Sequence, residues 1–216
     1  MSERLRCTLV SDGSSDRVLL PIVDWLLAQH SRETHFEPTI WAELRELPHP
    51  PKTLIEKIVR SLELYPCRIL FIHRDAENQT YAERKQEIAV AFSKAQTQIS
   101  GIPPMTCVIP VRMQEAWFLF DEQAIRGAAG NPNGKVRLNL PSLKQVESLA
   151  DPKSVLHALL KEASEKRGRK LDEFSPARHA HRLTDHITDY APLRQLSAFQ
   201  RFEQDLIDLL EHFSSH

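Results

Sequence analysis

Short apolar runs alternate with amphipathic stretches through the first half of the chain. The run at 68–72 is continuously apolar after Arg68, which is typical of a strand buried on both faces. Between the apolar runs, hydrophobic residues recur at intervals of three and four, which indicates helices. We therefore predict strands over 5–10, 36–41, 68–72 and 105–111, and helices over 16–30, 52–64, 81–100 and 112–120.

This alternation favours parallel strands joined by right-handed helical crossovers. The predicted fold class is α/β, with a short, mostly parallel, Toprim-like sheet of four strands flanked by helices. The pattern changes after Asp121, where a Gly/Asn/Pro loop at 127–134 leads into helical patterns only. We expect an α/β domain over 1–126 and a helical C-terminal lobe over 127–216, and the sequence leaves open whether the lobe packs on the same core. The helices of this lobe are predicted around 143–149, 152–166, 178–189 and 196–213.

Composition adds few constraints. The 216 residues are 41% hydrophobic and 26% charged, with a formal net charge of −1, so nucleic-acid binding would need a local basic patch or a partner. The three cysteines show no zinc-type spacing and are expected to be reduced thiols. There is no signal-peptide pattern and no apolar run of about 20 residues. We therefore expect a cytoplasmic protein that does not contact a membrane; its oligomeric state is left open.

Acidic residues follow the ends of three predicted strands. In an open parallel sheet, ligands bind beyond the carboxyl ends of the strands. Converging carboxylates are hard oxygen ligands that suit Mg²⁺ or Mn²⁺ better than zinc. Each pair also has a simpler interpretation, as helix caps or first-turn acids. The pairs are Asp12 with Asp16, Asp75 with Glu77, and Glu115 with Asp121.

Two of these strand ends resemble a known family. The strand followed by Asp12-Gly13-x-x-Asp16 is similar to the first Toprim motif, and the strand followed by Asp75-Ala76-Glu77 is similar to the second. Toprim domains occur in topoisomerases, primases and the overcoming-lysogenisation-defect nucleases, where they bind divalent metal and act on phosphodiesters. Two positions depart from the usual pattern, since Asp12 stands in place of Glu and Glu77 in place of Asp.

A second resemblance extends over nearly the whole chain. The segments that carry it are similar to those of small bacterial Toprim-like proteins of unassigned function. Such proteins are often encoded beside an ATPase, and relatives occur in anti-phage defence systems. The segments are 109–119 (IPVRMQEAWFL), 151–153 (DPK), 191–194 (APLR) and 199–202 (FQRF).

The resemblance implies a metal-dependent nuclease or related phosphodiester-cleaving enzyme, an effector in anti-phage defence. Asp75 and Glu77 would hold Mg²⁺ or Mn²⁺, with Asp12 and Glu115 contributing directly or through water. The metal would activate water and neutralise charge on the phosphate. The remaining catalytic candidates are Asp12 as a general base and Arg74 and Arg112 as stabilisers of the transition state.

The alternative is a non-catalytic effector or regulatory partner of an ATPase. The two departures from the Toprim pattern and the near-neutral charge favour it. Metal binding discriminates the two, because a pure adaptor has no need of a divalent ion. Nucleic acid and a partner ATPase are accordingly the expected partners.

Two further features lie in the C-terminal half. A basic stretch at 166–170, with Arg178 and Arg182 nearby, could contact phosphates, although a solvated loop is the simpler interpretation. It lacks interleaved aromatic residues for stacking on bases. His179, His181 and His186 do not share one helix face, which argues against zinc.

Overall fold

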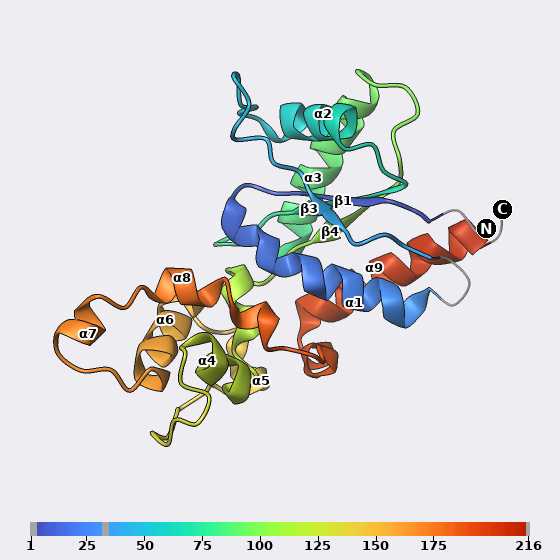
Figure 1. Cartoon of the computed structure of the whole chain (residues 1–216). Coiled ribbons are helices and arrows are strands. Elements are labelled where there is room, and N and C mark those ends of the chain that lie inside the picture. Colours follow the sequence, from blue (N-terminus) through green and yellow to red (C-terminus); the bar gives the residue numbers. More distant parts are fainter. Residues whose placement is uncertain (1–3, 32–34, 215–216) are drawn as a thin grey trace. The chain divides into compact units, whose positions relative to one another are not determined.

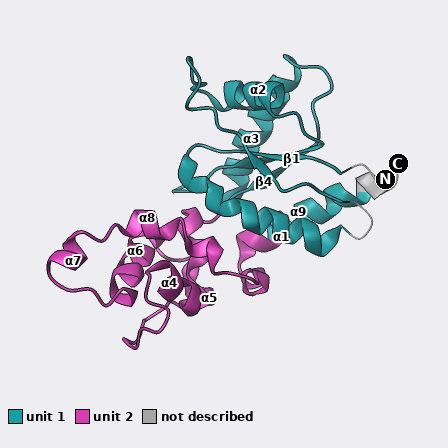
Figure 2. Ribbon diagram, viewed as in Figure 1, with its two compact units in different colours: residues 1–109, 201–216 teal, residues 110–200 magenta. Residues whose placement is uncertain are grey.

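The computed structural model describes residues 4–31 and 35–214, with side chains up to Glu211. Its contacts divide the chain into two compact units, drawn in Figure 2. The first unit contains residues 1–109 and 201–216, and the second contains 110–200. The division thus falls after residue 109, whereas the sequence suggested 126, and the C-terminal residues join the first unit.

The first unit is built on a parallel sheet of four strands in the order β2-β1-β3-β4. The predicted α/β class is therefore confirmed. The short β2 lies at an edge, a position compatible with Pro38 just before it, because proline has no N–H to donate to a neighbouring strand. The strands are β1 (Cys7–Val10), β2 (Ile40–Trp41), β3 (Ile69–His73) and β4 (Met105–Val108).

Helices cover both faces of this sheet (Figure 1). Helices α2 (Leu54–Leu64) and α3 (Tyr81–Gln96) lie on one face, and α1 (Leu20–His30) and α9 (Ser197–Ser214) lie on the other. A 3-10 helix, η1 (Ser14–Leu19), leads into α1, so the first predicted helix begins with a tighter turn. Threonine caps start α2 and α3 through complete capping boxes, as the Thr-x-x-Glu pattern requires.

Strand side chains alternate between the two faces. Val10, Leu70, Ile72 and Cys107 join the core beneath α2 and α3. On the other face, Phe71 meets Phe202 of α9 edge to face, with ring centroids 6.1 Å apart. The central strands are thus buried on both faces beneath helices, as their apolar runs predicted.

The regular elements of the second unit are all helices, joined by loops. Trp117 and Phe199 pack edge to face at 5.4 Å, both fully buried. A continuous helix over 178–189 was a wrong prediction, because two short helices lie there, and 112–120 forms only a short 3-10 helix. The elements are η2 (Gln114–Phe118), α4 (Glu122–Ala128), α5 (Leu143–Val146), α6 (Pro152–Ala163), α7 (Arg169–Asp172), α8 (Pro176–Ala180), η3 (Leu183–Asp185) and η4 (Ala191–Gln195).

Across the described part of the chain, no helix combines the length and the apolar character needed to cross a bilayer.

Candidate functional site

The register of the sheet brings two predicted site residues together. β1 and β3 are parallel neighbours with Val10 opposite Ile72. Two residues further along each strand direction, Asp12 and Arg74 therefore reach the same level at the carboxyl edge. Arg74 Nε donates to Asp12 Oδ2 over 3.1 Å. Residues 62 positions apart in the chain thus form an ion pair because of the strand pairing alone.

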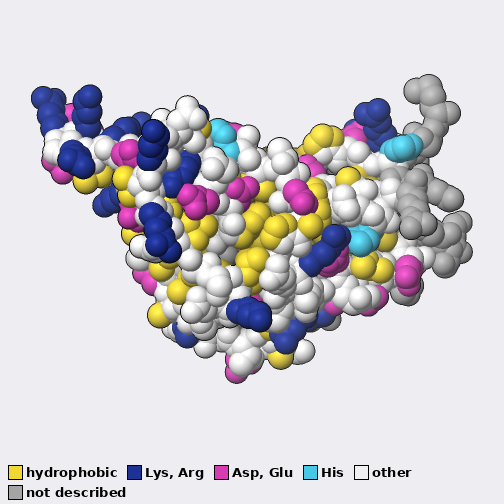
Figure 3. Space-filling model, turned by 90° about the horizontal axis from the view of Figure 1, so that it is seen from below, with side chains coloured by type: hydrophobic (Ala, Val, Ile, Leu, Met, Phe, Trp, Pro, Cys, Tyr) yellow, Lys and Arg dark blue, Asp and Glu magenta, His cyan; other side chains and the backbone are white. Residues whose placement is uncertain are grey.

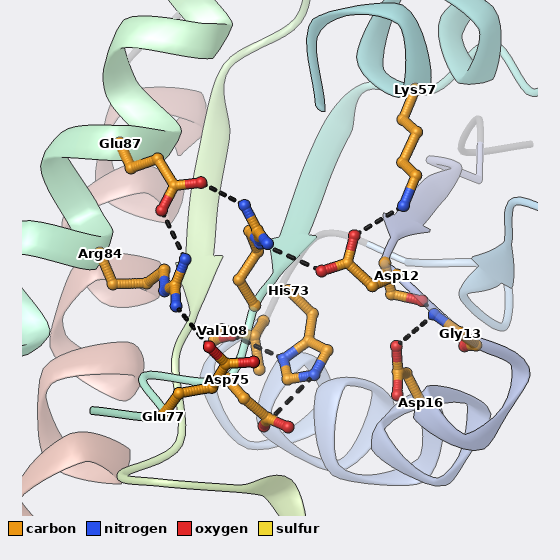
Figure 4. A network of polar contacts seen from close by, with 12 residues as sticks. Asp12, Gly13, Asp16, Lys57, His73, Asp75, Glu77, Arg84, Glu87 and Val108 are labelled. Atoms are coloured by element: carbon orange, nitrogen blue, oxygen red, sulfur yellow. Dashed lines mark hydrogen bonds and ion pairs between the residues drawn. The ribbon is translucent and has the colours of Figure 1, made fainter. Parts of the chain in front are cut away.

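An alternating chain of six charges runs across this edge (Figure 4). Lys57 Nζ donates to Asp12 Oδ1 at 2.6 Å, so both oxygens of that carboxylate accept from a cation. Beyond Asp12, Arg74 donates to Glu87 as well. Glu87 also accepts from Arg84 Nη1 at 2.5 Å, and Arg84 Nη2 reaches Glu77 Oε2 at 3.4 Å. We call this series, Lys57–Asp12–Arg74–Glu87–Arg84–Glu77, the ion chain.

The ion chain sets the protonation of Asp12. Partial burial opposes ionisation, but the hydrogen bond from Lys57 and the charge of Arg74 outweigh it. The pKa of the Asp12 carboxyl therefore lies below its usual value, and Asp12 is ionised at neutral pH. An ionised carboxylate can accept a proton or bind a cation, but here it does so in competition with two basic side chains.

Asp75 and Glu77 follow the end of β3, as predicted. His73, the last residue of β3, is buried and its Nδ1 lies 2.8 Å from Val108 O. Its Nε2 lies 3.7 Å from Asp75 Oδ1, so the ring and the carboxylate are neighbours. The side chain of Glu77 is 66% exposed, and that of Asp75 is 28% exposed. Solvent therefore reaches Glu77 freely, whereas Asp75 is only partly accessible and its Oδ1 is buried.

Glu77 has an unusual backbone. Its φ is +53°, in the left-handed region, where a residue with a Cβ is disfavoured by about 1–2 kcal/mol. Arg112, another candidate, has a φ of +62°. Among the described non-glycine residues, only Glu165 shares this feature. Strained conformations of this kind concentrate at binding and catalytic sites.

The simpler interpretation holds for two of the acids. Asp16 Oδ2 accepts from the backbone N–H of Gly13 at 2.9 Å and closes the turn before η1. Asp121 is the N-cap of α4, and its Oδ1 accepts from Ala124 N at 2.9 Å. Both side chains therefore serve the local backbone.

Glu115 and Arg112 belong to the second unit. Glu115 lies in the first turn of η2, with its side chain 12% exposed. Its carboxylate is 3.5 Å from Lys153 Nζ. Lys153 stands in the 151–153 segment that carried part of the family resemblance, so this ion pair joins two of the resembling segments.

The carboxylates suit Mg²⁺ or Mn²⁺ in a limited way. Within the described ranges, no three His, Cys, Asp or Glu side chains gather as ligands would. Mg²⁺ in enzymes, however, usually keeps several waters and takes one or two carboxylates together with substrate phosphates. Asp75, which is partly exposed, and Glu77, which is mostly exposed, are the two carboxylates that would hold the ion in that mode. Asp12 could join them only by leaving Lys57 and Arg74.

Comparisons with protein-family models, with curated proteins and with solved structures found no match to this chain. The resemblance to Toprim domains stays a prediction from the residues quoted above.

Sequence reasoning missed three members of the ion chain, namely Lys57, Arg84 and Glu87. Lys57 lies in the first turn of α2, and the other two lie in the first half of α3. In a parallel sheet with helical crossovers, a helix that follows a strand begins at the same edge at which the strand ends. A search of the first two turns of each predicted helix for charged residues would have found them.

The histidines of the second unit do not form a metal site within the described residues. His179 stacks on Phe174 at 4.1 Å, and its Nδ1 lies 2.6 Å from Ala128 O. His186 lies against Gly127, where an added Cβ would come within 2.7 Å of the ring. Both rings are thus packing elements of the second unit.

Proposed function

We propose that this protein is a divalent-metal-dependent nuclease, or a related phosphodiester-cleaving enzyme, of the Toprim type. The observation that carries the proposal is the position and backbone of Glu77. This exposed acid follows Asp75 at the carboxyl edge of a parallel sheet, and its left-handed φ is a cost that a plain surface loop does not require.

Residues of the first unit would divide the chemistry among them. Asp75 and Glu77 would hold Mg²⁺ or Mn²⁺, which would supply a polarised water and neutralise charge on the phosphate. Asp12, ionised at neutral pH, would accept the proton of the attacking water. Arg74 would then exchange its contact with Asp12 for a phosphate oxygen and stabilise the added charge.

The biological setting follows from the resemblance stated above. We propose that the protein is an effector in bacterial anti-phage defence and that it acts in the cytoplasm on nucleic acid. The free thiols of Cys7, Cys67 and Cys107 support a reducing compartment.

A second candidate is a non-catalytic effector or regulatory partner of an ATPase. The observation in its favour is that both carboxylate oxygens of Asp12 already accept hydrogen bonds, one from Lys57 and one from Arg74. A chain of alternating charges can hold four parts of the first unit together without any metal: α2, α3 and the loops that follow β1 and β3. In that case the acids at the edge would have a structural role.

The experiment is a calorimetric titration of Mn²⁺ and of Mg²⁺ into the purified protein. The test variant is Asp75→Asn/Glu77→Gln, which keeps both shapes and removes both charges. Its control is Glu46→Gln/Glu63→Gln, which removes two exposed acids of the same unit away from the strand ends. We expect saturable binding by the wild type and the control, and its loss in the test variant.

Two outcomes would count against the enzyme. Absence of binding by the wild type would overturn the stand-alone metalloenzyme and favour the regulatory partner. Equal binding by the test variant would move the metal away from Asp75 and Glu77. If binding behaves as expected, cleavage of single- and double-stranded DNA and RNA in Mn²⁺ is the next measurement, with the same two variants.

A further inference from the structure

The second unit carries an exposed stretch of positive charge between the end of α6 and η3. Figure 3 shows Lys and Arg side chains gathered over the end of this unit that carries α7. We call the stretch the basic segment. It consists of seven exposed cations: Lys161, Lys166, Arg167, Arg169, Lys170, Arg178 and Arg182.

Charge is divided unequally between the two units. The second unit, 110–200, contains 14 Lys and Arg against 11 Asp and Glu, a net of +3. The first unit, which makes up the rest of the chain, contains 14 against 18, a net of −4. The near-neutral net charge of the whole chain is therefore the sum of a negative first unit and a positive second unit. The low net charge argued against electrostatic attraction to nucleic acid, but this argument does not apply to the second unit alone.

Most cations of the basic segment have no acidic partner. Arg169 pairs with Glu173 at 2.8 Å, but within the described structure the other six make no ion pair. In the ion chain of the first unit, by contrast, every cation contacts a carboxylate. Of the six, Lys166 lies over the ring of Phe174 at 4.9 Å. Exposed cations without a carboxylate partner are available to an external anion, because no ion pair has to break first.

One acid in this region is already engaged by the backbone. Glu165 Oε1 accepts from the N–H groups of Lys135 and Val136, at 2.5 and 2.9 Å. These hydrogen bonds hold the pKa of the Glu165 carboxyl below its usual value. Glu165 therefore holds the loop at 135–136, and the two hydrogen bonds partly neutralise its charge.

The surface here is hollowed. An open hollow of about 410 Å³ is lined by three cations (Lys161, Lys166 and Arg167), two acids (Glu162 and Glu165) and the apolar side chains of Val136 and Leu171. Glu165 is already engaged by backbone N–H groups. The three cations, beside the apolar side chains, suit the phosphates of a ligand that alternates phosphate with sugar.

We propose that the basic segment binds the phosphodiester backbone of a nucleic acid, without regard to its sequence. Lys and Arg contacts to phosphate supply most sequence-independent affinity, through the release of counterions. Phe174, the aromatic residue of this segment, is 6% exposed and stacked on His179, so it is not available to stack on bases. This surface goes beyond the proposed metal site, because its residues and its chemistry need no metal.

Acidic membranes are the main competing ligand, and local structure disfavours them. Surface-binding helices need a long apolar face beside their basic one. α7 has four residues, α8 has five, and neither buries a residue on an apolar face. The charge lies on loops and short turns, which suits an irregular polyanion better than a flat lipid surface.

The test is binding of a fluorescent 20-nucleotide strand and of a 20-base-pair duplex, measured by anisotropy in EDTA across a salt series. The test variant is Arg167→Gln/Lys170→Gln. Its control is Lys52→Gln/Lys94→Gln, which removes two exposed cations from the first unit. Each phosphate contact contributes about −0.9 to the slope of log K against log salt on a duplex, so we expect the slope to weaken by about two units in the test variant only.

Several results would overturn the proposal. These are absence of wild-type binding at low salt, equal weakening by both variants, and an unchanged slope in the test variant. Equal binding to phosphatidylserine vesicles or polyglutamate would show a general anion surface instead. Since EDTA removes divalent metal, success or failure here is independent of the metal titration, and the Asp75→Asn/Glu77→Gln variant should bind nucleic acid as the wild type does.

Discussion

Glu77 holds a backbone conformation that glycine adopts freely and that other residues adopt at a cost. Its side chain is mostly exposed and touches Arg84 only at 3.4 Å, so packing does not explain why a glutamate stands there. A surface ion pair of this kind contributes at most about 1 kcal/mol. If the carboxylate of Glu77 binds a ligand, we expect the protein to be less stable with glutamate at this position than with glycine.

Replacing Glu77 with glycine should therefore raise the free energy of unfolding, by about 0.5–1 kcal/mol. The relieved strain exceeds the loss of a weak ion pair and the added backbone entropy of glycine. Urea denaturation measures the change, and the same variant should bind Mn²⁺ more weakly. Glu77→Gln is the control, because it keeps the strain and removes the charge. A glycine variant less stable than the glutamine variant would contradict this account.

At the scale of elements, α9 connects the two units. Its first residues belong to the second unit, and from Arg201 onward it belongs to the first. Phe202, Leu206 and Leu210 form a buried stripe at helical spacing. Asp205 accepts from Lys85 Nζ of α3 at 2.7 Å. A helix that sequence grouped with the C-terminal lobe is thus part of the layer that covers the sheet.

Phe202→Ala should lower the free energy of unfolding by about 3–5 kcal/mol, since it removes a fully buried ring from its contact with Phe71. Chemical denaturation followed by far-UV circular dichroism measures the loss. Gln204→Ala, at an exposed position of the same helix, should change stability by less than about 0.5 kcal/mol. A loss near 1 kcal/mol for Phe202→Ala would mean that α9 covers the sheet only loosely.

At the scale of the whole molecule, the reactivity of the three cysteine thiols measures the folding of the first unit, because all three lie in it. Cys7 in β1 and Cys107 in β4 are buried in the first unit, and Cys67 before β3 is only partly buried. Burial raises the pKa of the Cys107 thiol to about 12 and that of Cys7 still further. Burial also raises the pKa of Cys67, although hydrogen bonds with Thr8 oppose the shift.

A thiol reagent at pH 8 should accordingly modify Cys67 first, and Cys7 and Cys107 only when the first unit unfolds. The reactive thiolate is scarce at the buried sites, and the reagent has no path to them. Peptide mass spectrometry of timed samples, with and without urea, measures the order. Cys67→Ser should remove the early phase and leave the late one. Labelling of Cys107 as fast as Cys67 in native buffer would show that β4 opens locally.

Local pattern was sufficient to predict the α/β class, the positions of the four strands and the carboxyl-edge location of Asp12, Asp75 and Glu77. It was insufficient at 178–189, where the chain forms the end of a short α-helix and a 3-10 helix in place of one continuous helix. It also missed Lys57, Arg84 and Glu87. Arg84 and Glu87 pair with each other at i,i+3 spacing within α3, but the contacts that join these three residues to Asp12, Arg74 and Glu77 cross between elements.

By itself, the sequence determined which segments become strands and helices, since hydrophobic period, caps and turn residues act over a few positions. It also determined that the connections are crossovers, because strands and helices alternate. Only the tertiary structure decided that Asp12 meets Arg74, that the final helix returns to the sheet and that Glu77 takes a left-handed backbone. These features depend on strand register and on packing between residues far apart in the chain, which no local pattern encodes.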